Sequence, residues 1–345
     1  MPSLPISSLQ YPWLETPDPG TTIEVAPGVH WLSMPLPFQL DHINLWLLRD
    51  GSGWTIVDTG IGNLETRALW EQLLSRFIGI KRVIVTHYHP DHAGNAAWLC
   101  KRFGVELWMT QGEYLTAHAV RAAGAGYTAE AVLAVFRRNG LDDERYGRMA
   151  AARTGNRYAE LVPDFPLSHR RIIEGDRLGI GGRDWRAFIG HGHAPEHLSL
   201  YCADLDVVIA GDMLLSTIST NVSVWSIDPE GDPLRLFLES LQRYRELPQD
   251  VLVLPSHGKP FRGAHTRVEQ LEKHHAARLG ELLETLRGGA RSAGELLGVL
   301  FRRPLDAHQS FFAMGEAIAH LHYLYYAGRV KRAPGADGIM RYATS

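Results

Sequence analysis

The sequence has only two cysteines in 345 residues, Cys100 and Cys202. Two are too few for a disulfide framework, and they fit a reducing compartment. Long apolar runs are also missing, so we expect no membrane-spanning helix. The opening residues 1–5 lack the basic and apolar segments of a secretory signal. Together these absences predict a soluble cytoplasmic protein.

The sequence also lacks a strong charge of either sign. Its formal net charge is −3, which gives no whole-chain reason to expect a polyanionic partner. Hydrophobic residues make up 45% of the chain and charged residues 21%, so a sizeable core can form. At this length we expect one large domain and a smaller one.

Histidine, in contrast, is concentrated in one stretch. Residues 86–95 follow a short apolar run and read THYHPDHAGN. The side chains that can bind a metal in this stretch are His87, His89, Asp91 and His92. Isolated histidines are usually structural, but this fixed spacing of four residues is a strong motif.

The backbone expected for this stretch brings the four side chains together. Two positions apart on extended backbone, His87 and His89 point to the same side. Pro90 then suits the first position of a helix, which carries Asp91 and His92. The spacing predicts two adjacent metals, one on each pair. Imidazole and carboxylate ligands favour zinc, with iron or manganese as alternatives.

Other apolar runs also end in polar residues that suit a metal site. Residues 53–57 lead to Asp58, residues 207–209 lead to Asp212, and residues 251–254 lead to His257. Strands that alternate with helices and carry their site at the strand ends are typical of α/β proteins. We therefore expect an α/β fold whose strand ends meet at one site.

A helical stretch, about residues 112–158, interrupts this pattern and is rich in Ala and Arg. We expect it to be an insertion that either covers the site or packs as a surface hairpin. After residue 264 the pattern becomes helical, with a capping box at Ser292 and Glu295 and a short β wing from Val330 to Tyr342. This gives a catalytic domain over residues 20–263 and a C-terminal subdomain over residues 264–345.

On the basis of these strand-end residues, the stretch 22–260 resembles the metallo-β-lactamase superfamily. The resemblance implies an αββα sandwich with two divalent metals, most simply zinc, at a sheet edge. It implies that His87, His89 and His193 hold the first metal. The second metal would lie on Asp91, His92 and His257, with Asp212 between the two ions. Asp58 would support the ligand loop.

Two histidines near His193 leave alternatives open. His191, in the same Gly-His-Gly-His-Ala-Pro run, competes as a ligand, although the Gly-His-Ala-Pro frame favours His193. For His197 we expect support of the site rather than direct ligation. The C-terminal subdomain is similar to the winged-helix-like region of some superfamily members.

Two metals that share a water would make a hydroxide nucleophile, with Asp91 carrying the proton to the leaving group. We therefore expect a hydrolase acting on a small acyl substrate, a thioester or a lactone or ester, as in the glyoxalase II-like and lactonase-like members. Asp212 argues against β-lactamase activity, since known β-lactamases of the fold commonly lack this carboxylate. The substrate-binding residues stay unknown. Tyr88, Trp225 and Lys259 are candidates by proximity alone.

Two other functions stay open. One is a nuclease or phosphodiesterase that grips nucleic acid through Arg302, Arg303 and the basic run from Arg329 to Arg332. From Thr266 onward the chain has eleven Lys and Arg against eight Asp and Glu, which is only mildly basic and fits a solvated surface. The other is a regulatory binding protein whose metal fold has lost turnover, but the presence of all seven ligands weighs against it. A homodimer also stays open.

Overall fold

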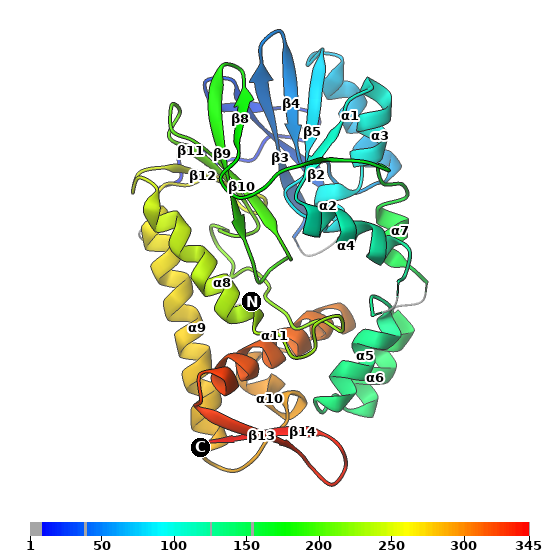
Figure 1. Ribbon diagram of the computed structural model, residues 1–345, viewed down its shortest axis with the longest axis vertical. Helices are drawn as coiled ribbons and strands as arrows, with labels where there is room; N and C mark the ends of the chain where they lie inside the picture. Colours follow the sequence, from blue (N-terminus) through cyan, green and yellow to red (C-terminus); the bar gives the residue numbers. More distant parts are fainter. Residues whose placement is uncertain (1–8, 38–39, 125, 153–154, 345) are drawn as a thin grey trace.

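The computed structural model describes residues 9–37, 40–124, 126–152 and 155–344. Two β-sheets lie at one end of the molecule, and helices of the C-terminal part lie at the other end (Figure 1). Residues 1–5, on which the expectation about a secretory signal rests, lie outside the described residues. None of the helices in the described part is long and apolar enough to cross a bilayer.

The first sheet has, within the described residues, seven strands in sequential order. They are β1 (Ile23–Ala26), β2 (Val29–Pro35), β3 (His42–Asp50), β4 (Gly53–Val57), β5 (Ile80–Ile84), β6 (Leu107–Met109) and β7 (Arg170–Arg171). The strands from β1 to β4 pair antiparallel, and those from β4 to β7 pair parallel. The parallel half places the carboxyl ends of β4 and β5 side by side.

The second sheet has, in the same described part, five strands in the order β12-β11-β10-β9-β8. They are β8 (Arg177–Ile180), β9 (Arg183–Gly190), β10 (His197–Cys202), β11 (Val207–Gly211) and β12 (Leu252–Pro255). Only β11 and β12 pair parallel, so their carboxyl ends also lie next to each other.

The strand β3 shows why both faces of the first sheet are buried. Ile43, Leu45 and Leu47 belong to the core under helices α1 (Leu64–Leu74) and α3 (Ala96–Phe103). Trp46 and Leu48 face the second sheet and belong to the core between the sheets. Successive side chains of a strand point to opposite faces, so an almost wholly apolar strand fits between two cores.

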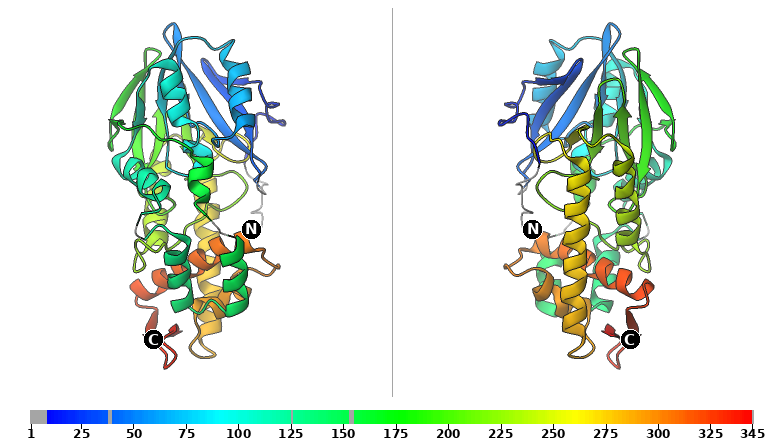
Figure 2. Two further views of the ribbon diagram at one scale, coloured as in Figure 1. Left: turned by 90° about the vertical axis from the view of Figure 1, so that its right-hand side faces the viewer. Right: turned by 90° about the vertical axis from the view of Figure 1, so that its left-hand side faces the viewer.

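The outer face of the second sheet is covered in the same way. Val208 and Ala210 of β11 share a core with Leu234 and Phe237 of α8 (Pro233–Leu241). The layers therefore run helix, sheet, sheet, helix, and the expected αββα sandwich is confirmed (Figure 2).

Local sequence signals explain several helix ends. Asp232 caps α8 by accepting a hydrogen bond from the Arg235 N–H, with Pro233 at the first position. The helix ends at Leu241 and tightens into the 3-10 segment η1 (Gln242–Glu246). Such tightening is common in the last turn of a helix.

The insertion after β6 consists of four helices within the described residues. They are α4 (Gln111–Arg121), α5 (Ala129–Arg138), α6 (Asp143–Ala152) and α7 (Arg157–Leu161). Helices α5 and α6 pack on each other and against the C-terminal helix α11 (Ala307–Tyr326), with which they share a core. The rings of Phe136 and Phe311 meet there with centroids 5.3 Å apart. Whether the insertion covers the site during turnover stays a prediction.

The C-terminal part contains α9 (Ala264–Leu286), α10 (Ala293–Leu300), α11 and the hairpin of β13 (Val330–Pro334) and β14 (Met340–Thr344). Ser292 and Glu295 form the expected capping box at the start of α10. One hydrophobic core continues from Phe261 through Ala264 and Val268 into α9. The expected division at residue 264 stays a prediction, since this core runs across it.

Candidate metal centre

The His-rich stretch occupies the turn from β5 to the short helix α2 (Pro90–Ala93). His89 stands at the N-cap in extended conformation, with φ −55° and ψ 147°, and Pro90 takes the first helical position. The chain therefore turns as its sequence predicted, and residues on both sides of Pro90 face one region.

Four side chains from three segments form a first group of possible ligands. Their nearest ligand atoms lie within 4.8 Å of one another, and the residues are His87, His89, His193 and Asp212. Nε2 of His87 lies 2.9 Å from Nδ1 of His89 and 3.3 Å from Nε2 of His193. Oδ2 of Asp212 lies 3.3 Å from Nε2 of His193.

A second group lies beside the first and contains Asp91, His92 and His257. Oδ2 of Asp91 is 3.4 Å from Nε2 of His257 and 3.8 Å from Nε2 of His92. The other oxygen of Asp212, Oδ1, is 3.5 Å from Nε2 of His92 and 3.6 Å from Nε2 of His257. One carboxylate thus faces both groups, each with a different oxygen.

Two buried atoms test whether this arrangement fits a metal. Among the described residues, neither Nε2 of His92 nor Oδ1 of Asp212 has a hydrogen-bond partner. Leaving such atoms unsatisfied costs about 1–3 kcal/mol each. Imidazole nitrogens and carboxylate oxygens that converge at these distances suit divalent cations such as zinc. The donor set therefore fits divalent metal ions.

The other ring nitrogen of several of these histidines is held by a fixed acceptor. Nδ1 of His193 donates to the carbonyl oxygen of Asn221 at 2.8 Å, and Nδ1 of His257 donates to that of His42 at 3.1 Å. Because Nδ1 is the donor, Nε2 keeps its lone pair toward the centre.

Asp58 and His197 lie where support of the site was expected. Asp58, with φ 62°, accepts hydrogen bonds from Nδ1 of His92 at 2.8 Å and from the N–H of Thr86 at 2.7 Å. It thereby joins the start and the end of the ligand loop. Nε2 of His197 accepts the backbone N–H of Asp212 at 3.0 Å, which fixes the position of that carboxylate.

The electrostatics of the centre follow from burial and from the two carboxylates. Burial lowers the pKa of His89 to about 3, so its imidazole stays neutral and can donate a lone pair. Burial would raise the pKa of Asp91, but His92 and His257 outweigh it and lower that pKa to about 2. Burial alone would depress the pKa of His92, yet Asp58, Asp91 and Asp212 raise it well above the usual value. A proton and a cation therefore compete for His92.

The alternatives from the sequence lie outside the two groups. Nδ1 of His191 is hydrogen-bonded to the carbonyl oxygen of Pro195 in its own loop, at 2.6 Å. Trp225 packs against Phe311, with ring centroids 5.6 Å apart, and Lys259 donates to the backbone carbonyl of Leu14. These contacts give Trp225 and Lys259 structural roles.

Two residues that touch the ligand loops were missed in the sequence. Glu113, in the first turn of α4, accepts the backbone N–H of Tyr88 at 2.9 Å and that of Glu196 at 2.6 Å. Burial raises the pKa of Glu113 to about 7. An acidic residue in a first turn is common, so it gave no signal. Asn221 acts through its backbone carbonyl, which any residue carries.

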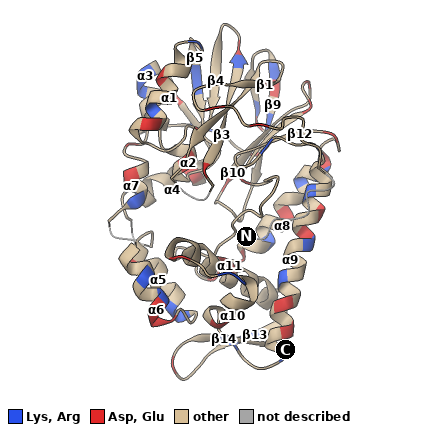
Figure 3. Ribbon diagram, turned by 180° about the vertical axis from the view of Figure 1, so that it is seen from behind, with Lys and Arg blue, Asp and Glu red and all other residues tan. Residues whose placement is uncertain are grey.

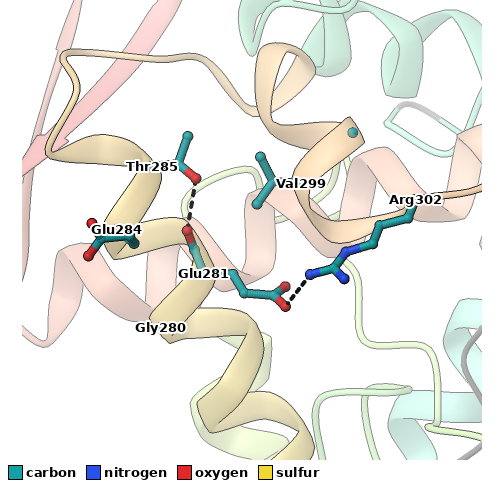
Figure 4. A pocket seen from close by; sticks show the side chains of 7 residues that line it. Gly280, Glu281, Glu284, Thr285, Val299 and Arg302 are labelled. Atoms are coloured by element: carbon teal, nitrogen blue, oxygen red, sulfur yellow. Dashed lines mark hydrogen bonds and ion pairs between the residues drawn. The ribbon is translucent and has the colours of Figure 1, made fainter.

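A depression of about 470 Å³ lies elsewhere, between α9 and α10 (Figure 4). Its lining includes Gly280, Val299 and Arg302, and it has no histidine. The guanidinium of Arg302 is paired with Glu281 at 3.0 Å. None of the residues in either ligand group lines it, so this depression is separate from the metal centre.

Two family models match the chain. Residues 39–257 match the family model of the metallo-beta-lactamase superfamily. The chain belongs to this superfamily. A model of the metallo-beta-lactamase-like C-terminal domain matches residues 279–345. As a superfamily member with named metallo-hydrolase relatives, the chain is a metal-dependent hydrolase, and a small molecule is its expected class of substrate.

Solved structures of the superfamily support the fold over nearly the whole chain. A beta-lactamase domain protein from Burkholderia ambifaria is 48% identical with a TM-score of 0.92, and the match covers 99% of both chains. A metallo-beta-lactamase family protein from Thermus thermophilus is 31% identical with a TM-score of 0.78. That match covers 92% of this chain and 99% of the other.

Curated relatives in the superfamily are more distant. The probable metallo-hydrolase YqjP of Bacillus subtilis is 25% identical over 85% of this chain and 91% of its own length. An atrochrysone carboxyl ACP thioesterase of Aspergillus fumigatus is 23% identical over 81% of this chain and 75% of its own length.

Proposed function

We propose that this chain is a binuclear metal-dependent hydrolase that cleaves a thioester or a lactone or ester. The observation that carries the proposal is the position of Asp212, whose two oxygens face the two ligand groups separately. A carboxylate placed in this way can hold two cations close together. We propose zinc as the metal, with iron or manganese as alternatives that the same donors accept.

The seven side chains have distinct roles in this proposal. His87, His89 and His193 would hold one ion, and Asp91, His92 and His257 would hold the other, with Asp212 shared. When bound, two such ions acidify a water molecule and polarise the oxygen of the bond under attack.

Asp91 is the proposed proton carrier of the reaction. The pair of His92 and His257 keeps its carboxylate ionised, as the lowered pKa of Asp91 indicates. An ionised carboxylate at the edge of the centre can accept a proton from water and return it to the leaving group. Asp58 and His197 hold the ligand loop and Asp212 in place.

Two observations support an acyl substrate. The thioesterase among the relatives acts on an acyl carrier protein and aligns over most of this chain. Shorter matches, over 30% and 26% of this chain, are hydroxyacylglutathione hydrolases. Both names describe hydrolysis at an acyl carbon. The C-terminal part, proposed as winged-helix-like, would then belong to the support of the site rather than to nucleic-acid binding.

Two of the basic residues that suggested nucleic acid form ion pairs within the chain. Arg302 pairs with Glu281, and Arg332 pairs with Glu230 and lies over the ring of Tyr325. Lys and Arg alternate with Asp and Glu along α9 (Figure 3). A nuclease needs a surface of free positive charge along its substrate, and these pairs reduce it.

A substrate panel tests the proposal. The metal-replete protein is assayed with an acyl thioester, an acyl lactone, a simple aryl ester and a phosphodiester at equal concentration. We expect cleavage of a carbonyl substrate that is lost in His89→Ala. Cleavage of the phosphodiester alone would overturn the acyl assignment, and two ions bound without any cleavage would favour the binding protein.

A further inference from the structure

Glu113 is a buried carboxylate with no cation beside it. Its side chain is fully buried, and no Lys or Arg in the described part of the chain forms an ion pair with it. Its two oxygens instead accept two backbone N–H groups, from Tyr88 at 2.9 Å and from Glu196 at 2.6 Å. Burying a carboxylate costs free energy unless its oxygens accept hydrogen bonds, and both oxygens of Glu113 do so.

The two N–H groups belong to the two loops that carry ligands of the first group. Tyr88 stands between His87 and His89, and Glu196 follows His193 by three positions. These loops come from different sheets, since one follows β5 and the other joins β9 to β10. One side chain therefore connects ligand loops that are far apart in the sequence.

Neighbouring bonds strengthen the same connection. The side chain of Glu196 accepts the backbone N–H of Gly112 at 2.7 Å, and the hydroxyl of Thr110 donates to the Glu196 carbonyl at 2.8 Å. The hydroxyl of Tyr158, from α7, donates to the Tyr88 carbonyl at 2.6 Å. The first helix of the insertion is thus fastened to both loops at its N-terminus.

We propose that Glu113 is a positioning residue that sets the distance between the two ligand loops of the first metal group. The inference rests on the proposed binuclear function but adds a residue that does not touch a metal or substrate. A carboxylate suits this task because both of its oxygens accept. A glutamine offers one acceptor oxygen and one amide donor, so one of the two N–H groups would lose its partner.

The test is the metal affinity of Glu113→Gln, measured by competition with a chromophoric chelator and by the visible spectrum of the cobalt-substituted protein. We expect the ion of the first group to bind about 10–100-fold less tightly, the usual effect of losing a group that orients a ligand. The cobalt spectrum should shift as well, because the ligand geometry changes. Saturating metal should restore most of the activity, since no ligand has been removed.

Glu295→Gln is the matched control. Glu295 also accepts a backbone N–H in the first turn of a helix, that of Ser292 at 2.7 Å, but it lies in α10 away from both ligand loops. Its substitution should leave the metal affinity and the cobalt spectrum unchanged. An equal loss of affinity in both variants would overturn the inference.

The outcomes separate this inference from the proposed function. If the wild-type protein binds two ions and Glu113→Gln binds both with wild-type affinity, the positioning role is wrong and the binuclear hydrolase stands. If the wild-type protein binds no ions, both fall. Should Glu113→Gln fail to fold, Thr110→Val removes a neighbouring bond of the same connection. We then expect a several-fold weaker affinity, and an unchanged affinity would overturn the inference.

Discussion

Two clusters of histidines in this protein differ in the partners of their ring nitrogens. The metal centre contains five histidines whose ring nitrogens converge with the carboxylates of Asp91 and Asp212. The second cluster, His274, His275 and His320, lies between α9 and α11. There Nδ1 of His275 meets Nε2 of His320 at 3.1 Å, and Nδ1 of His320 is bonded to the Glu316 carbonyl at 2.8 Å.

The difference lies in convergence and charge rather than in residue type or burial. Within the described residues, the groups of three or more possible ligands are those of the metal centre, and the α9–α11 cluster forms none. Burial lowers the pKa of His320 to about 4 and keeps its imidazole neutral. Of the chain's 17 histidines, those gathered around carboxylates are the ones placed to bind cations.

The largest expected effect comes from removing a ligand of the metal centre. His89→Ala should lose bound metal and reduce kcat/KM by about a thousandfold or more, because several kcal/mol of charge stabilisation depend on the ion. Metal content is measured by mass spectrometry of the purified variant. His275→Ala is the matched control and should keep its metal. Metal loss in both variants would show that the two clusters do not differ in their contribution to metal binding.

The parts of this comparison that the sequence predicted depend on local signals. The spacing of His87, His89, Asp91 and His92 identified one ligand loop, and Pro90 identified the turn that orients it. The capping box of Ser292 and Glu295 located a helix start, because a cap bonds to a backbone group only two or three positions away. Such signals are complete within a short stretch of sequence.

The parts that the sequence missed depend on contacts between distant segments. Glu113 bonds to residues 25 and 83 positions away, and nothing near it indicates either partner. The packing of α5 and α6 on α11 likewise joins residues such as Phe136 and Phe311. An amphipathic helix indicates that one face is buried but not which surface covers it. For this reason the sequence did not indicate which surface the inserted helices pack against.

A smaller effect is expected from the carboxyl of Glu316, whose backbone carbonyl is bonded to His320 of the second cluster. Burial raises the pKa of Glu316 to about 7 from 4.5, so this group contributes stability below about pH 4.5 and loses it as pH rises through 7. Glu316→Gln should therefore exceed the wild type in unfolding free energy at pH 8, by up to about 3 kcal/mol. The difference should shrink toward pH 4.5. Chemical denaturation at several pH values checks this.

The histidines of the same cluster give the opposite dependence. His320, with its pKa lowered to about 4, contributes stability above about pH 6.5 and loses it as pH falls toward 4. The wild-type protein therefore has two opposing contributions over the same range. Without the carboxyl, Glu316→Gln should lose stability more steeply on acidification. A difference between variant and wild type that does not change with pH would contradict the burial of a titrating Glu316.

A further effect is expected where the C-terminal part touches the metal centre. A Cβ atom on Gly315 of α11 would lie 2.7 Å from Cβ of Ser223, in the segment whose Asn221 carbonyl holds His193. Gly315→Val should therefore displace this segment and cost about 1–3 kcal/mol of stability. It should also weaken metal binding. Gly298→Val, at a position where a Cβ meets nothing within 4 Å, is the control for substituting glycine in a helix of the same region. Equal metal affinity in both variants would show that the contact of α11 with the Ser223 segment does not affect metal binding.

The smallest expected effect concerns the surface of the C-terminal part. The side chain of Arg302 is 79% exposed and pairs with Glu281, so the pair is screened by solvent and contributes less than about 1 kcal/mol. Arg302→Ala should leave kcat/KM unchanged and barely alter the denaturation midpoint. A double-mutant cycle with Glu281→Ala measures the coupling between the two charges. A coupling well above about 1 kcal/mol would mean that this surface pair is held as rigidly as the residues of the metal centre. The two regions would then differ only in the chemistry of their side chains.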